Sequence, residues 1–147
     1  MIKGLHLRAL CQNDAPAALS LYNELTFGPE SQDKDSFQTV ISHPGTTVFG
    51  AILEGELVAM LTLHILPNVT WSARPYALVE NVITREDHRR RGIGKQLMEH
   101  AVATGWDANA YKVMLMTGKK RGAAGFYRAA GFSAEDKTAM VIRQPDT

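Results

Sequence analysis

Three apolar, β-branched runs follow one another before the chain's second long helical pattern: Thr46 to Leu53, Leu57 to Ile65 and Tyr76 to Thr84. Runs of this length and composition are typical of β-strands. Only Glu54, Gly55 and Glu56 separate the first two, which predicts a hairpin. The chain must therefore fold around a sheet in which at least two neighbouring strands are antiparallel.

Local signals predict the other elements. Alternation of apolar and polar residues indicates strands, helical spacing after a capping residue indicates helices, and a glycine after a helix marks its end. The remaining expected elements are a strand at Leu5 to Ala9, a helix after Asp14, a short helix from Asp35 to Ile41, a helix from near Gly92 or Gly94, a strand at Val113 to Met116, a helix from about Ala123 to Ala130 ended by a left-handed Gly131, and a last strand at Thr138 to Arg143.

Size and composition indicate an ordinary globular protein. The 147 residues fit one domain, 1–147, and no apolar run approaches the roughly 18 residues of a membrane span. We therefore expect no membrane partner. The single cysteine, Cys11, forms no internal disulfide, so we expect a cytoplasmic location. Sixteen basic residues against fifteen acidic ones give a net charge of +1, which argues against a nucleic-acid partner.

The segment from Asn81 to Leu97 predicts an anion site. A strand is followed by a charged turn, and then by Arg89-x-x-Gly92-x-Gly94 at the start of an amphipathic helix. Backbone amides at a helix start are unpaired and the helix dipole is positive there, so a phosphate can accept several hydrogen bonds. Glycine lets the phosphate approach those amides. The alternative is a solvated charged turn that the glycines only punctuate.

Two nucleotide-binding loops fit this segment poorly. A dinucleotide fingerprint needs glycine where Leu97 stands. A Walker A loop needs glycine where Arg89 stands, and Ser or Thr where Gln96 follows Lys95. The phosphate is therefore expected to belong to another kind of ligand.

The C-terminal third completes a family resemblance. It contains Ala123-Ala124-Gly125-Phe126-Tyr127-Arg128-Ala129-Ala130-Gly131-Phe132. Together with the Arg89 to Gly94 loop, this resembles the GNAT superfamily of N-acetyltransferases, in particular small-molecule amine acetylators. The resemblance implies an α/β fold: a mixed, largely antiparallel twisted sheet flanked by helices, with a parallel central strand pair that splays around the coenzyme. It also implies acetyl-CoA as the cosubstrate and direct transfer in a ternary complex.

The resemblance assigns roles residue by residue. Tyr127 would donate a proton to the departing thiolate, although packing of its helix is the alternative. A backbone amide near Val82 would polarise the thioester carbonyl. Relatives often carry an asparagine where this chain has Thr117-Gly118. The implied coenzyme-binding residues are Val82, Ile83, Thr84, Arg89, Arg90, Arg91, Gly92, Ile93, Gly94, Lys95 and Phe126.

Glu80 is the candidate general base. An acceptor amine has a pKa near that of lysine, about 10.4, and must lose a proton before it attacks. Glu80 lies in an otherwise apolar strand, where desolvation is expected to raise its pKa. The alternative is that Glu80 binds substrate without moving a proton. The five histidines show no metal-ligand spacing, so no metal is expected.

The acceptor is expected to be a primary amine on a small molecule. A protein N-terminus or lysine is the alternative substrate, and a non-catalytic acyl-CoA sensor is the alternative protein class. If the chain assembles, a homodimer is the commonest soluble form. The loops expected to shape the acceptor pocket, Gly28 to Pro44 and Pro67 to Pro75, carry no signature of one substrate.

Overall fold

The computed structural model describes residues 1–145 of the 147-residue chain. They divide into two compact units, one of residues Met1–Leu115 and one of residues 116–145. The expectation of a single domain over the whole chain stays a prediction.

The first unit is built on a five-stranded sheet whose strand order follows the chain order. All neighbours pair antiparallel except the last two, which are parallel. This confirms the predicted mixed, largely antiparallel sheet with a parallel pair. The strands are β1 (Leu5–Ala9), β2 (Thr46–Leu53), β3 (Glu56–Leu66), β4 (Tyr76–Thr84) and β5 (Val113–Leu115).

The hairpin between β2 and β3 is a two-residue turn. Glu54 and Gly55 both have positive φ, 52° and 85°. Two left-handed residues in succession match the twist of the strands they join, and glycine at the second position adopts this conformation without strain. The hairpin that the sequence predicts is therefore confirmed, with a shorter turn than expected.

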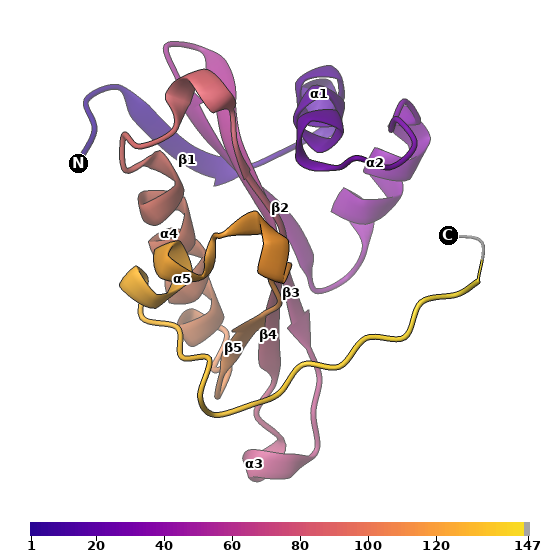
Figure 1. Ribbon diagram of the computed structural model, residues 1–147, viewed down its shortest axis with the longest axis vertical. Coiled ribbons are helices and arrows are strands. Elements are labelled where there is room, and N and C mark those ends of the chain that lie inside the picture. The colour runs from indigo at the N-terminus through magenta and orange to yellow at the C-terminus, as the bar shows by residue number, and fades with distance from the viewer. Residues whose placement is uncertain (146–147) are drawn as a thin grey trace. The chain divides into compact units, whose positions relative to one another are not determined.

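Helices cover both faces of the sheet (Figure 1). Helices α1 (Ala15–Leu25) and α2 (Lys34–Ser42) pack on one face, and α4 (Ile93–Asp107) packs on the other. Apolar side chains of α1, α2 and the sheet form a buried cluster on the first face. This cluster consists of Leu10, Ala15, Ala18, Leu21, Phe37, Val48, Leu57, Met60 and Ile83.

Four short elements complete the first and second units. Between the strands and long helices lie η1 (Gln12–Asp14), α3 (Thr70–Ala73) and η2 (Glu86–His88), and η3 (Lys119–Arg121) lies in the second unit. In α3, three consecutive residues, Trp71, Ser72 and Ala73, have positive φ, so this element is a left-handed turn rather than a regular helix. No helix within residues 1–145 is both long and apolar enough to span a bilayer.

The second unit contains α5 (Ala124–Ala129), whose end matches the prediction. Gly131 has φ of 97°, and the Phe132 and Gly131 amides donate to the Tyr127 and Arg128 carbonyl oxygens at 3.0 Å each. This pair of hydrogen bonds is a Schellman motif, which satisfies the last helical carbonyl groups.

The predicted strand at Thr138 to Arg143 is wrong. The segment forms no strand in the structure, and Met140 and Ile142 are almost fully exposed. A strand forms only where a neighbouring backbone pairs with it, and alternation in the sequence does not supply that partner. Among the described residues, the parallel pair β4 and β5 therefore lies at the end of the strand order rather than at its centre.

An ion pair connects the end of β1 to the start of α1. The Arg8 guanidinium donates to both Asp14 carboxylate oxygens, at 2.8 and 2.9 Å, and the Cys11 amide donates to one of them at 2.8 Å. Hydrogen bonding from Arg8, followed by that from Cys11, lowers the pKa of Asp14 to about 2. The charged carboxylate therefore stabilises the folded state.

We expect Asp14→Asn to destabilise the protein in a pH-dependent way. Because the folded-state pKa lies below the unfolded value of about 3.9, the stabilisation is complete above that value and is lost as the pH falls towards 2. The Arg8 side chain is 47% exposed, so the loss at pH 7 is about 1 kcal/mol. Urea unfolding of both proteins from pH 7 to pH 3 should show their difference shrinking, and a constant difference would contradict this role.

Candidate functional site

Strand β4 loses one of its neighbours halfway along its length. Its pairing with β5 covers only residues 77–79, whereas its pairing with β3 continues to Thr84. Within residues 1–115, the stretch 80–84 therefore has no strand along the edge that β5 occupies earlier. The unpaired groups of such an edge can receive an extended ligand as an added strand. Val82, Ile83 and Thr84, the residues predicted to bind pantetheine, lie in this stretch.

A β-bulge lies at the beginning of the open stretch. Between two paired positions, β3 has one residue, Leu61, and β4 has two, Asn81 and Val82. Asn81 has φ of 51°, a left-handed conformation that asparagine adopts more readily than most residues. A bulge leaves its extra residue outside the regular ladder and bends the strand. Val82, near which a backbone amide is predicted to polarise the thioester carbonyl, therefore lies at an irregular step of β4.

The start of α4 has the features expected of an anion site. Gly92 precedes the helix with φ of 80°, and no side chain caps the helix start. The first-turn amides, those of Ile93, Gly94 and Lys95, have no partner within the helix. Gly92 adopts a left-handed conformation, which glycine accommodates without strain. The predicted phosphate-binding amides are therefore free of a side-chain cap.

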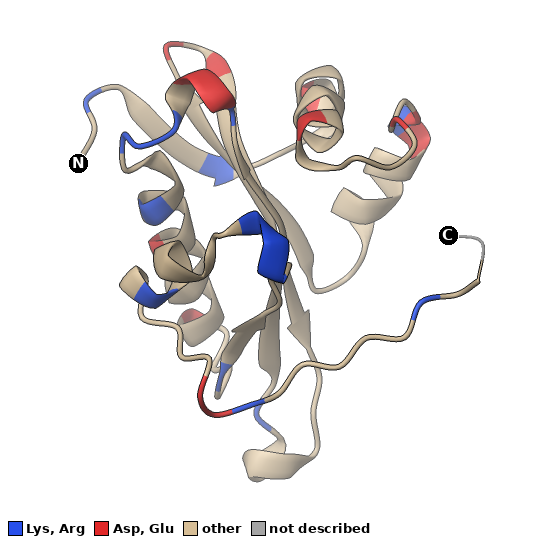
Figure 2. Ribbon diagram, in the orientation of Figure 1, with Lys and Arg blue, Asp and Glu red and all other residues tan. Residues whose placement is uncertain are grey.

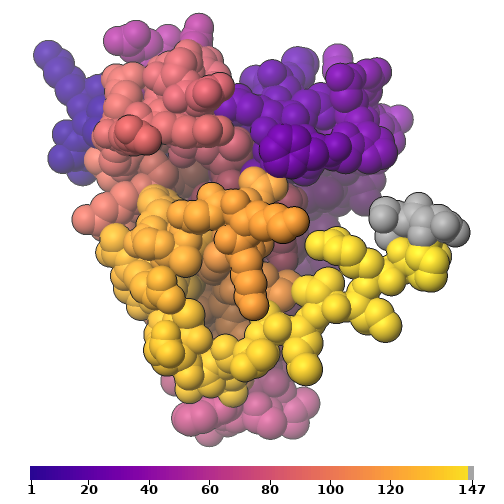
Figure 3. Space-filling view, viewed as in Figure 1, coloured from indigo at the N-terminus to yellow at the C-terminus, as the bar shows by residue number. Residues whose placement is uncertain are grey.

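Basic side chains gather at this helix start. Figure 2 shows the basic loop that enters α4, directly after the acidic residues of η2. Arg90 and Arg91 are exposed, and neither forms an ion pair with a residue in 1–145. Lys95 lies 3.8 Å from Glu99. In Figure 3 the turn between β4 and α4 lies at the surface, so these cations can meet an incoming phosphate.

Arg89 has a different environment from its neighbours. Its Nε donates to the Thr84 carbonyl oxygen at 3.0 Å, and its guanidinium lies 3.2 Å from the Glu24 carboxylate. The same Glu24 oxygen accepts the Glu86 amide at 2.8 Å. Arg89 and Glu24 therefore hold the turn between β4 and α4 against α1. Sequence reasoning missed Glu24 because 65 residues separate it from Arg89.

A second set of charges braces the same turn. Arg85 donates to the Asp87 carboxylate at 2.7 Å and to Glu56 at 3.0 Å, and the His88 ring lies 2.7 Å from Asp87. Hydrogen bonding from Arg85, then from His88, holds the pKa of Asp87 well below its usual range. These contacts fix the path of the chain from the open edge of β4 to the start of α4.

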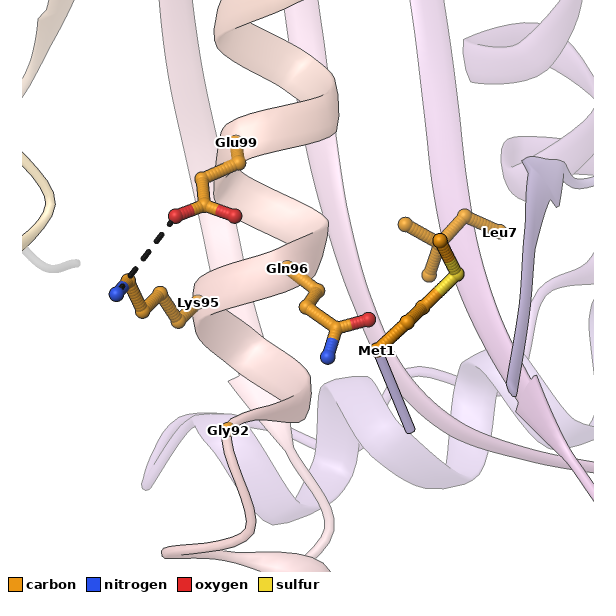
Figure 4. Close-up of a pocket in the computed structure, with 6 residues that line it drawn as sticks. All are labelled: Met1, Leu7, Gly92, Lys95, Gln96 and Glu99. Carbon is orange, nitrogen blue, oxygen red and sulfur yellow. Dashed lines mark ion pairs between the residues drawn. The ribbon is translucent and has the colours of Figure 1, made fainter. Parts of the chain in front are cut away.

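A depression adjoins the start of α4 on the side of β1 (Figure 4). The Gln96 side chain points towards Met1 and Leu7, whereas Lys95 and Glu99 lie on another side of the helix. The depression leaves this flank of the helix start open to solvent. Its lining residues are Met1, Leu7, Gly92, Lys95, Gln96 and Glu99.

Glu80 lies on the face of the sheet that α1 and α2 cover. It pairs with Thr62 of β3, and directly opposite residues of an antiparallel pair share a face. The Tyr22 hydroxyl of α1 hydrogen-bonds to the Thr62 side chain, and burial raises the pKa of Tyr22. Glu80 itself is half-buried. The candidate base therefore has polar neighbours on an otherwise apolar face.

Tyr127 and Phe126 lie in α5 of the second unit. Tyr127 is half-buried, and its ring makes edge contacts with the rings of Phe126 and Phe132, with centroids 5.1 and 6.3 Å apart. These contacts show a packing role for Tyr127. Its role as a proton donor, and that of Phe126 in coenzyme binding, stay predictions. Within residues 1–145 no three His, Cys, Asp or Glu side chains are grouped as a metal site.

Comparisons with known proteins identify the family. The model of the acetyltransferase (GNAT) family matches residues 7–132. The chain is 28% identical over 140 residues to glucosamine 6-phosphate N-acetyltransferase of Trypanosoma brucei brucei, covering 92% of this chain and 94% of that protein.

Solved structures agree with the family match. A protein from Agrobacterium tumefaciens str. C58, assigned as an acetyltransferase, has a TM-score of 0.89 and 42% identity, and covers 95% of this chain and 99% of its own. An aminoglycoside acetyltransferase from an uncultured soil sample, solved with trehalose, has a TM-score of 0.83 at 23% identity and 96% coverage of both chains, and so shows the fold alone. The chain therefore belongs to the GNAT acetyltransferase family and is an acyl-coenzyme A dependent acetyltransferase.

Proposed function

We propose that this enzyme transfers the acetyl group of acetyl-CoA to a primary amine on a small molecule, directly and within a ternary complex. One observation carries the proposal: the open edge of β4 runs through a braced turn into the uncapped start of α4. An extended amide-containing arm suits the first feature and a pyrophosphate suits the second. Acetyl-CoA contains both in one molecule.

The chemistry follows from the groups along β4. Glu80 takes a proton from the acceptor ammonium, and the neutral nitrogen attacks the thioester carbonyl carbon. The developing oxyanion accepts a hydrogen bond from the amide near Val82. The C–N bond forms, the C–S bond breaks, and Tyr127 supplies a proton to the thiolate of coenzyme A. The nitrogen, positively charged after its attack, gives up its second proton to become the amide, and that proton restores the Tyr127 hydroxyl. Each step uses a group of the required type.

A small-molecule acceptor is supported by the relative that acts on glucosamine 6-phosphate, which the chain matches over nearly its whole length. Acidic residues before and at the start of α2 could attract a cationic amine, but one of them has a structural role. Asp33 accepts hydrogen bonds from the Asp35 amide and the Ser36 hydroxyl, and so caps α2.

We further propose a cytoplasmic location, since Cys11 is an exposed free thiol, the form that a reducing compartment maintains.

The direct test offers acetyl-CoA with a panel of amines and follows release of the free thiol. We expect turnover with small amino sugars or other primary amines, and mass spectrometry should find one acetyl group on the amine nitrogen. Peptides with free N-termini or lysines form the second arm of the panel. Turnover with peptides alone would contradict the small-molecule proposal, and thiol release without any amine product would contradict amine acetylation.

We expect Gly92→Ala to weaken acetyl-CoA binding by about tenfold or more, equivalent to about 1.4 kcal/mol. The new β-carbon both strains the left-handed residue and stands between the phosphate and the helix amides. Gly55→Ala is the matched control, because Gly55 also has positive φ and open space around it but lies in the hairpin turn. Isothermal titration calorimetry should show near wild-type affinity for Gly55→Ala. Equal losses in both variants would indicate strain rather than a phosphate site.

We expect Glu80→Gln to lower kcat by about a hundredfold or more, with unchanged affinity for acetyl-CoA, because it removes the proton acceptor and keeps the side-chain shape. Tyr127→Phe should lower kcat in the same manner by removing the proton donor. Glu54→Gln, at the exposed hairpin turn, is the control and should be unaffected. Steady-state kinetics would contradict the assignment if Glu80→Gln raised the KM for the amine and left kcat unchanged, since that result indicates substrate binding alone.

A further inference from the structure

A threonine hydroxyl joins two histidines on the α1 and α2 side of the sheet. Thr46 Oγ1, at the first residue of β2, lies 3.0 Å from Nδ1 of His43 and 2.8 Å from Nδ1 of His64. Thr46 is 8% exposed, His64 is half-buried, and His43 is exposed just after α2. The arrangement therefore connects a surface histidine to one inside the sheet through a buried hydroxyl.

The hydrogen-bonding capacity of Thr46 restricts where the protons of His43 and His64 can lie. A hydroxyl has one proton to donate, and both of its neighbours are Nδ1 atoms. The Thr46 proton can go to only one of these nitrogens, so at least one ring carries its own proton on Nδ1 and donates it to Thr46. The nitrogen that carries the proton in a histidine ring is set by the bond that the other nitrogen makes. Thr46 therefore couples the tautomers of His43 and His64.

The register of the sheet places His64 close to Glu80. Thr62 lies directly opposite Glu80, and His64 follows Thr62 by two residues on the same strand face. Diagonal neighbours of this kind have Cα atoms about 7 to 8 Å apart, within the reach of long side chains or of one bridging water. His64, which is hydrogen-bonded to Thr46, therefore lies beside Glu80, the carboxylate proposed as the base.

We propose that His64 receives the acceptor's proton from Glu80, and that Thr46 and His43 are positioning residues that hold the His64 ring ready to accept it. In the resting state, His64 Nδ1–H donates to Thr46, and the Thr46 hydroxyl donates to Nδ1 of neutral His43. Nε2 of His64 then carries a lone pair. The inference rests on the proposed function, because it requires an amine that loses a proton to Glu80.

The proton balance of this step is simple. Glu80 becomes a neutral carboxylic acid when it takes the amine proton, and passes that proton to His64 Nε2, directly or through one water. The resulting imidazolium keeps its Nδ1–H bond to Thr46, which stabilises the charge. Loss of the Nε2 proton to solvent restores both the histidine and the carboxylate. No other reactant is consumed.

Substitutions at Thr46 test the positioning role. Thr46→Val keeps the shape and removes the hydroxyl, and we expect kcat to fall by about tenfold or more with the KM for the amine unchanged. Thr46→Ser restores the hydroxyl and should restore most of kcat. Thr47→Val is the matched control, because Thr47 is the next residue of β2 and points to the opposite face. Thermal unfolding of each variant reports its fold.

Two further measurements read His64 itself. Nitrogen-15 NMR of the histidine rings should show the Nδ1–H tautomer of His64 in the wild type and its loss in Thr46→Val. His64→Ala should lose activity and regain part of it with added imidazole. The proposal is overturned if His64 carries its proton on Nε2 in the wild type, if Thr46→Val retains full kcat, if Thr46→Ser is as slow as Thr46→Val, or if imidazole has no effect. Absence of turnover in the wild type with every amine would instead overturn the proposed function, and this inference with it.

Discussion

The candidate site depends on the short pairing between β4 and β5, which ends at residue 79 of β4. A parallel neighbour that continued beyond residue 79 would occupy the backbone groups of residues 80–84. Instead, β5 ends, and a bulge at Asn81 bends β4 at the same point. Within residues 1–115, this edge of β4 therefore has no strand partner beyond residue 79, and a ligand able to hydrogen-bond as a strand can bind there. Glu80 lies immediately before the bulge, on the face of the sheet opposite to α4.

The turn after β4 connects this open strand edge to the start of α4. Arg89 and Glu24 hold the turn against α1, and Arg85 braces it through Asp87 and Glu56. Individually, exposed ion pairs add little stability. Here their contribution is geometric, because they fix the distance and direction between the open strand edge and the uncapped start of α4. A rigid turn would let one ligand contact both features at once, as our proposal requires.

Local patterns were sufficient to predict the strands of the five-stranded sheet, the long helices and the glycine turns. Gly92 and Gly131 both have the positive φ that their positions predict, because a helix boundary is set by a few adjacent residues. The Asn81 bulge was not predictable, since the polar residues Glu80 and Asn81 interrupt the apolar pattern of β4 without indicating an extra residue in the ladder. Nor was the bond between Thr46 and His64, which lie 18 residues apart and meet only through strand register. The prediction of a strand at 138–143 was wrong for a different reason. The residue pattern is typical of a strand, but no neighbouring strand pairs with this segment in the described structure.

We infer that the open edge of β4 and the start of α4 bind one coenzyme molecule together. Amide NMR of the protein during titration with coenzyme A can establish this, because each backbone amide reports its own environment. If one molecule occupies both places, the signals of residues 82–84 and 92–95 will shift together and yield a single dissociation constant. Binding that leaves these amides unmoved, or that shifts only the residues lining the depression beside Met1, Leu7 and Gln96, would contradict it.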